Sequence, residues 1–210
     1  MRKLPIYILI DTSGSMRGEP IEAVKVGLRS LFKALRRDPY ALETVHLSII
    51  TFDREARVLM PMTEVEKAAL PEIPELQSSP TNLGEALHLM CKRYDSEVIR
   101  STMAAKGDWL PLAVVMTDGS PSDTLLFSTM CEAIRKYPFS RIIGCAAGPK
   151  ARMEPLRLFC SDVVSLETMD SNSFSKFWQW VSQAFTRQSQ SGSIVKEDLP
   201  PPPPEILIAP

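Results

Sequence analysis

Three oxygen-bearing side chains follow the first apolar run of the chain at alternate positions. Asp11, Ser13 and Ser15 come directly after residues 5–10, which read Pro-Ile-Tyr-Ile-Leu-Ile. In an extended segment, side chains two residues apart point the same way, so these three oxygens can converge on one ion. Gly14, between the serines, permits turn dihedrals that a Cβ would penalise. Carboxylate and hydroxyl oxygens suit a hard divalent cation such as magnesium.

Two further oxygen-bearing residues stand at comparable places. Asp118 ends the apolar run 112–116, and Thr81 opens a helix-like segment after the turn signal Ser-Ser-Pro. Each piece also has an ordinary explanation, because Asp and Ser favour turns and Thr81 could be a helix N-cap. Together they predict one divalent-metal site. The two carboxylates and three neutral hydroxyls carry a total charge that only balances the charge of the ion. The ion can therefore still accept a carboxylate from another molecule.

Taken in order, Asp11-x-Ser13-x-Ser15, Thr81 and Asp118 resemble the metal-ion-dependent adhesion site (MIDAS) of von Willebrand factor A domains. The resemblance covers about residues 4–188. It implies that the three hydroxyls bind the ion directly and that both aspartates act largely through bound waters. It also implies Mg²⁺, with Mn²⁺ or Ca²⁺ as alternatives, and a protein partner that supplies an Asp or Glu to the metal.

A narrower resemblance rests on longer stretches of sequence. Tyr-Ile-Leu-Ile-Asp-Thr-Ser-Gly-Ser-Met, Pro-Thr-Asn-Leu-Gly-Glu-Ala-Leu, Val-Met-Thr-Asp-Gly-Ser-Pro-Ser-Asp and the proline-rich end are similar to bacterial TerY-type proteins associated with tellurite resistance. This implies an adaptor in a tellurite or metal-stress resistance pathway or a phosphorylation-linked pathway. Kinase or phosphatase components of that pathway are then candidate partners.

Composition sets wider bounds. The chain has 210 residues, of which 44% are hydrophobic and 23% charged, which suits one domain, expected at 1–190, and a proline-rich tail at 191–210. A net charge of −1 gives no electrostatic argument for nucleic acid or an anionic membrane surface. No apolar stretch is long enough for direct membrane insertion. The four widely spaced cysteines predict buried thiols in a reducing cytoplasm, where we expect the protein.

The apolar pattern predicts strands that alternate with helices. Strands are expected at 5–11, 45–53, 56–60, 111–117, 140–146 and 162–167. Helices are expected from Pro20 to about Leu35 and at 82–100, 124–137, 151–159 and 172–187. The stretch 61–80 is expected to be a long connection with a helical turn at 64–70.

This alternation predicts an α/β fold, a three-layer doubly wound structure with a mostly parallel six-stranded sheet. The strand 56–60 is expected at its antiparallel edge, and the resemblance names this arrangement as the Rossmann-like von Willebrand A fold. Ligands of such sheets bind at the carboxyl ends of the strands, where the strand order reverses. Asp11 and Asp118 end the two strands expected to flank that point.

The function predicted is a metal-dependent protein-protein interaction module without enzymatic activity. The alternative is a metal-dependent hydrolase or phosphatase that uses the same ion. Against it, position 13 is Ser rather than the second Asp of aspartyl-phosphate phosphatases, and no Gly-x-Ser-x-Gly or P-loop motif is present. A vestigial site is disfavoured because all five ligand positions are intact.

The C-terminal part carries three smaller predictions. The last helix has an apolar row that ends at Phe185, and Trp180 falls off this row, which makes it a candidate for an exposed partner contact. The prolines 200–204 predict an extended polyproline II segment. The apolar residues 206–208 are expected to pack on this domain or on a partner, and deletion of 191–210 is expected to leave folding intact.

Overall fold

The computed structural model describes residues 2–74, 79–149, 151–168, 170–191, 199–204 and 206–208. Its strands are β1 (Leu4–Asp11), β2 (Val45–Phe52), β3 (Ala56–Glu64), β4 (Leu112–Thr117), β5 (Arg141–Ala147), β6 (Asp162–Leu166) and β7 (Leu207–Ile208). Its helices are the 3₁₀ turn η1 (Gly14–Met16), α1 (Glu19–Arg37), α2 (Pro39–Thr44), α3 (Leu83–Glu97), α4 (Thr124–Ile134), α5 (Glu154–Arg157) and α6 (Ser171–Ser191). None of these described helices is long and apolar enough to cross a membrane.

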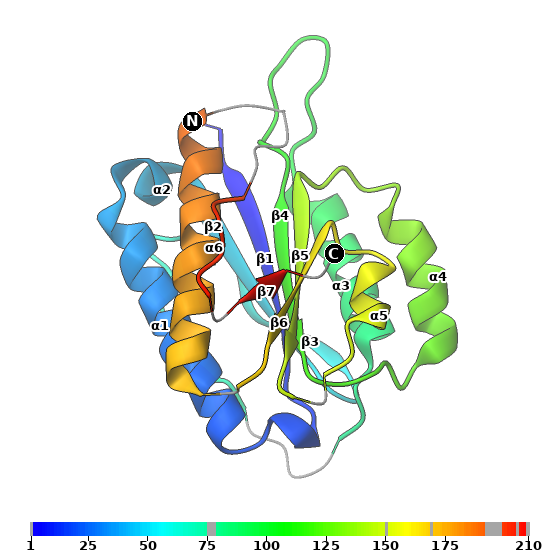
Figure 1. Cartoon of the computed structure of the whole chain (residues 1–210). Helices are drawn as coiled ribbons and strands as arrows, with labels where there is room; N and C mark the ends of the chain where they lie inside the picture. The colour runs from blue at the N-terminus through cyan, green and yellow to red at the C-terminus, as the bar shows by residue number, and fades with distance from the viewer. Residues whose placement is uncertain are drawn as a thin grey trace.

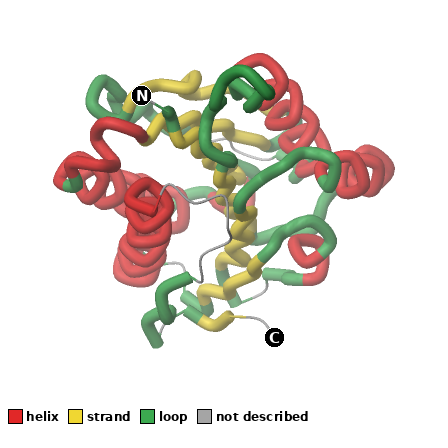
Figure 2. The backbone as a smooth tube through the Cα atoms, turned by 90° about the horizontal axis from the view of Figure 1, so that it is seen from above, coloured by secondary structure: helices red, strands yellow, loops and turns green. Residues whose placement is uncertain are grey.

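The described strands form one sheet in the order β3-β2-β1-β4-β5-β6-β7. The β1, β2, β4, β5 and β6 strands pair in parallel, and β3 pairs antiparallel with β2. Helices α1, α2 and α6 cover one face, and α3, α4 and α5 cover the other (Figures 1 and 2). This confirms the predicted three-layer α/β fold with six mostly parallel strands. The short β7, which pairs antiparallel with β6, is an addition from the tail.

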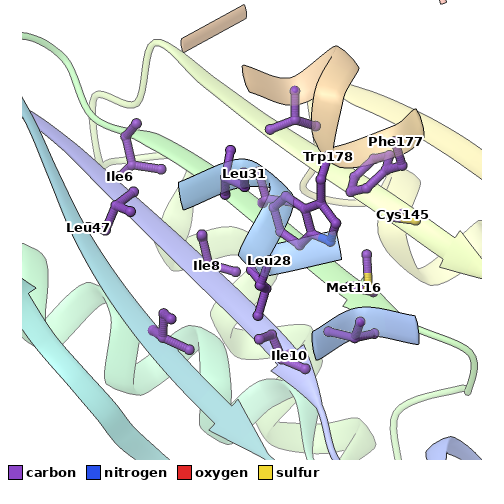
Figure 3. Close-up of a cluster of buried hydrophobic side chains, with 14 of the residues drawn as sticks. Ile6, Ile8, Ile10, Leu28, Leu31, Leu47, Met116, Cys145, Phe177 and Trp178 are labelled. Carbon is purple, nitrogen blue, oxygen red and sulfur yellow. The ribbon is translucent and has the colours of Figure 1, made fainter. Parts of the chain in front are cut away.

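The β1 strand is buried on both faces of the sheet, and every residue before Asp11 is apolar. Its even-numbered residues, such as Ile8, belong to the core under α1 and α6, as Figure 3 shows. Its odd-numbered residues, such as Tyr7 and Leu9, belong to the core under α3 and α4. A continuous apolar run is what a central parallel strand requires. The strand ends at Asp11 because a carboxylate cannot continue either core.

The α1–α6 contact is unusually close at Gly27. A Cβ built on Gly27 would lie 2.3 Å from Cδ1 of Trp178, whose side chain is fully buried (Figure 3). Glycine at this helix position therefore lets the indole ring lie directly against the backbone of α1.

Several predicted boundaries were wrong, and one helix was missed. The β3 strand continues past Met60 to Glu64, because it is an edge strand whose pairing with β2 is irregular there, and both features tolerate Pro61. The expected helical turn at 64–70 is only the hydrogen-bonded turn 64–68. The α2 helix was not predicted, although Asp38 before a proline is a known helix-start signal; its side chain accepts a hydrogen bond from Ala41 N at 2.8 Å. The helices α3, α4 and α5 are also shorter than expected, and α6 is longer.

The described part of the tail packs against α6 and β6. The side chain of Ile206 is 3% exposed and belongs to the core, which confirms that this apolar end packs on the domain. Trp180, the candidate for an exposed partner contact, is buried instead: its side chain is 2% exposed and its Nε1–H donates to Pro200 O at 2.7 Å. Helical periodicity could not reveal a cover that comes from another segment. The domain boundary at residue 190 stays a prediction.

Candidate metal centre

Four of the five predicted ligands lie at the carboxyl ends of two adjacent strands. The chain leaves β1 through α1, on one face of the sheet, and leaves β4 through α4, on the other. Neighbouring strands whose connections leave on opposite faces define the point where ligands bind in such sheets. Asp11 is the last residue of β1, and Asp118 directly follows β4. The topology thus brings together two carboxylates that are 107 positions apart in the sequence.

Direct contacts join the ligand candidates that follow β1 to Asp118, which follows β4. The hydroxyl of Ser15 donates to Asp118 Oδ1 at 2.8 Å, and the Oγ atoms of Ser13 and Ser15 are 3.3 Å apart. Asp11 Oδ1 accepts from Ser13 N at 2.8 Å, and its Oδ2 accepts from the Thr117 hydroxyl at 2.5 Å. Both carboxylate oxygens of Asp11 therefore accept hydrogen bonds and keep further acceptor capacity.

Thr81 reaches the same place from the segment before α3. A Cβ built on Gly119 would lie 3.2 Å from Thr81 Oγ1, so the missing side chain of that glycine leaves room for the hydroxyl beside Asp118. Asn82, not Thr81, occupies the N-cap position of α3. Within the described residues the Thr81 hydroxyl makes no hydrogen bond, which leaves its oxygen available as a ligand.

The loop after β4 holds Thr81 in place. Ser122 N donates to Thr81 O at 2.8 Å, and Thr81 N donates to the Ser122 hydroxyl at 3.1 Å. The next residue, Asp123, accepts hydrogen bonds from Gly84 N at 3.1 Å and Glu85 N at 2.8 Å, at the start of α3. A carboxylate at this position neutralises the exposed N–H groups and the positive end of the helix.

Asp53 is a supporting residue that the sequence analysis missed. It directly follows β2, its side chain is 4% exposed, and its carboxylate accepts from the hydroxyls of Thr12 at 3.1 Å and Ser79 at 3.3 Å. Asp53 therefore joins the loop after β1 to the segment that ends at Thr81. Its sequence signal was the same as that of the two predicted aspartates, an acidic residue at the end of an apolar strand. Thr117, which binds Asp11, was also missed.

The electrostatics of the site favour a cation. Burial raises the pKa of Asp11 to about 6, against hydrogen bonds from Ser13 and Thr117 that lower it. Burial also raises the pKa of Asp118, against the hydrogen bond from Ser15. Within the described residues, neither carboxylate forms an ion pair with a Lys or Arg. Two carboxylates without a compensating charge lower their free energy when a divalent ion joins them.

The donor set fits a hard ion. All five candidate ligands are oxygens, and the described residues contain no group of three or more His, Cys, Asp or Glu side chains that could hold a metal by themselves. The hydroxyls are therefore needed to complete the site. His46 contacts the Thr44 carbonyl and His88 is exposed on α3, so neither belongs to it. The described cysteines are free thiols.

Comparisons with known proteins agree with this architecture. A family model described as von Willebrand factor type A domain matches residues 6–177. A search among curated proteins found no match.

Three solved structures share the fold at low identity. Proximal thread matrix protein 1 from the mussel byssus has a TM-score of 0.64 and 13% identity over 86% of this chain and 47% of its own. A von Willebrand factor type A protein from Catenulispora acidiphila has a TM-score of 0.62 and 15% identity, with 90% and 43% covered. The pilus adhesin SpaC from Lactobacillus rhamnosus GG, in its open conformation, has a TM-score of 0.70 and 10% identity, with 90% and 30% covered. The chain thus spans less than half the length of each, and these likenesses show the fold. A further structure of the mussel protein has a zinc-occupied MIDAS motif.

Proposed function

We propose that this chain, which belongs to the von Willebrand factor type A domain family, is a metal-dependent protein-interaction module. Domains of this family typically mediate contacts between proteins. The observation that carries the metal dependence is the pair of uncompensated carboxylates, Asp11 and Asp118, placed among hydroxyls at the carboxyl edge of the sheet.

The two carboxylates differ in a way that suits such a module. Asp11 is 0% exposed, whereas Asp118 is only half-buried and its hydrogen-bond donor Ser15 is exposed. The site is therefore sealed toward the sheet and open toward solvent. A bound Mg²⁺ would supply a positive charge with an exchangeable position for a partner's Asp or Glu. Asp11, Ser13, Ser15, Thr81 and Asp118 would hold it.

The finer identity of the module extends the same proposal. The sequences around the site are similar to those of TerY-type proteins, so we place the chain in a cytoplasmic bacterial pathway for tellurite or metal stress, or one linked to phosphorylation. Hard oxygen donors support Mg²⁺, with Mn²⁺ or Ca²⁺ as alternatives. We further propose that the chain is not an enzyme. A hydrolase or phosphatase that uses the same ion is the competing reading, and a panel of phosphate and ester substrates with Mg²⁺ separates the two.

Metal binding by the isolated chain is tested by calorimetric titration with MgCl₂. We expect weak binding, because the site lacks a full protein cage, and its loss in Asp118→Asn and Ser15→Ala. Ser120→Ala is the matched control, because Ser120 is an exposed serine of the same loop that is not a predicted ligand. Equal binding by all four proteins would place the ion elsewhere.

Partner binding is tested by capture from a bacterial lysate on the immobilised chain, with Mg²⁺ or with EDTA. A partner captured by the wild type in Mg²⁺, and lost both in EDTA and in Asp118→Asn, supports the metal bridge. A partner retained by the Asp118→Asn chain in EDTA would contradict it.

A further inference from the structure

A second candidate binding site lies at the opposite end of the sheet. A cavity of about 320 Å³, here the loop pocket, is lined by Arg2, Tyr94, Arg100, Trp109, Pro111 and Pro138, among others. Arg2 precedes β1, while Trp109 and Pro111 precede β4. The metal-site aspartates end these same strands, so the two sites lie at opposite ends of the domain. Nothing in the proposed metal-dependent function uses this pocket.

One wall of the pocket is an ordered loop, residues 99–108, which projects from the domain between α3 and β4 (Figure 1). Asp108 N donates to Ile99 O at 2.7 Å, and Asp108 Oδ2 accepts from Ile99 N at the same distance. At the tip, Thr102 N donates to Ala105 O at 2.9 Å. A Cβ on Gly107 would lie 2.2 Å from Ile99 O, so only glycine permits this close return of the chain.

The interior of the pocket is aromatic and its charged groups are stacked on the rings. The guanidinium of Arg2 lies over Trp109 at 5.9 Å, and that of Arg100 lies over Tyr94 at 5.6 Å. Known small-molecule sites are concave, mostly apolar and about 300–1,000 Å³ in volume, with a few polar groups that fix the ligand. The loop pocket is at the lower end of that range, which suits a ligand of one ring.

The charge balance of the lining selects an anion. The described hydrogen bonds of Arg2 go to two backbone carbonyls, of Gly107 and Asp108, and leave its charge without a carboxylate partner in the described residues. The Asp108 carboxylate is itself neutralised by Lys3 at 3.4 Å. Arg100 pairs with Asp95, but both side chains are more than half exposed, so this pair is weak. Of the five N–H donors of the Arg2 guanidinium, the carbonyls take two.

We infer that the loop pocket binds a small aromatic carboxylic acid, with the ring against the apolar lining of the pocket beside Trp109 and the carboxylate on Arg2. Arginine is suited to this because it can bind a carboxylate through two parallel hydrogen bonds while it stacks on an aromatic face. The site is separate from the metal centre, so the inference does not depend on the proposed function.

The test is calorimetric titration with 3-phenylpropionate, in EDTA and again in MgCl₂. We expect a Kd on the order of 0.1–1 mM for a ligand of this size, equal in both buffers. Two comparison compounds separate the contributions: 3-phenylpropanol keeps the ring without the charge, and propionate keeps the charge without the ring. Each should bind at least tenfold more weakly. Equal binding of the acid and the alcohol, or no binding of the acid at 10 mM, would overturn the inference.

Variants test the assigned contacts. Arg2→Gln should weaken binding of 3-phenylpropionate by about tenfold, the effect of one charge-assisted hydrogen bond. Arg57→Gln is the matched control, because it removes the same charge from an exposed side chain on β3 and should bind as the wild type does. Gly107→Ala should abolish binding by displacing the loop wall. If that variant does not fold, Arg2→Gln decides, and unchanged affinity there overturns the assignment.

A peptide ligand tests whether the pocket binds a free small acid or the C-terminus of a protein. The tripeptide Gly-Gly-Phe carries an aromatic ring beside a free C-terminal carboxylate. Binding of this peptide no tighter than that of 3-phenylpropionate supports a small free acid. Binding more than tenfold tighter would overturn that source and assign the pocket to the C-terminus of a protein.

Discussion

The buried carboxylate of Asp11 should reduce the stability of the metal-free protein, and Asp11→Asn should remove that effect. Asparagine has nearly the same shape and can keep both contacts of the native side chain. Its carbonyl accepts from Ser13 N, and its amide donates to the Thr117 hydroxyl, which then acts as acceptor. The substitution therefore removes the charge with little change in packing.

The magnitude follows from the pKa. Burial raises the pKa of Asp11 from 3.8 to about 6 in the folded protein. A difference of about 2 in pKa corresponds to roughly 3 kcal/mol at about 1.4 kcal/mol each. Asp11 is 0% exposed, so solvent does not screen this effect. Ionised Asp11 should therefore lower the free energy of unfolding by about 3 kcal/mol, which is a large fraction of the stability of a typical domain.

The sign fixes the pH range. Below pH 3.8 the carboxyl is protonated in both states and contributes nothing. Between pH 3.8 and about 6 the folded state holds a proton that the unfolded state has lost, so stability falls as pH rises. Above about pH 6 the carboxyl is ionised in both states and the full difference remains.

The assay is urea unfolding of both proteins in EDTA, from pH 3.5 to pH 8. We expect equal stability near pH 3.5 and a difference that grows to about 3 kcal/mol in favour of Asp11→Asn above pH 6. In thermal unfolding at pH 8, a difference of this size corresponds to roughly 6–12 °C. A difference that does not vary with pH, or a variant less stable than the wild type at pH 8, would refute the reasoning.

Four further outcomes are expected. Mg²⁺ affinity should fall as pH drops below about 6, because a proton then occupies Asp11, and calorimetry in two buffers should detect the released proton. Gly27→Ala should lower the free energy of unfolding by about 1–3 kcal/mol in urea melts, since its Cβ would displace Trp178. Asp53→Ala should weaken Mg²⁺ binding by about 10–100-fold in calorimetry, because it releases the two segments that carry ligands. Deletion of 199–210 should lower stability by about 2–3 kcal/mol in the same melts, because it removes the buried side chain of Ile206 and uncovers Trp180, contrary to the expectation from sequence.

The two strands that flank the site, and therefore the position of the site, could be predicted because both follow from local patterns. A run such as β1, apolar at every position and ended by Asp11, indicates a central parallel strand with a ligand site at its carboxyl end. The same reasoning placed Asp118 on the neighbouring strand. Metal binding by these residues stays a prediction.

The supporting contacts could not be predicted, because they join segments far apart in the sequence. Asp53 binds a hydroxyl 41 positions before it and another 26 positions after it. Trp180 is covered by a carbonyl of the tail 20 positions away. Periodicity describes which side of an element is apolar, but it carries no information about which other segment covers that side. For the same reason the loop pocket, formed where Arg2, Arg100 and Trp109 meet, left no signal in the sequence.

The core and the metal site impose opposite demands on the same two strands. The apolar residues of β1 and β4 fix Asp11 and Asp118 near each other, where burial destabilises their charged forms. An ion that binds only the folded state adds RT ln(1 + [L]/Kd), which is about 2.7 kcal/mol at a hundred times Kd. This is close to the roughly 3 kcal/mol by which ionised Asp11 destabilises the metal-free fold. Metal binding would therefore offset the destabilisation caused by ionised Asp11. It would also supply the positive charge that a partner's carboxylate binds. Because one ion has both effects, the unfolding free energy and the affinity for an acidic partner should rise together with Mg²⁺ concentration.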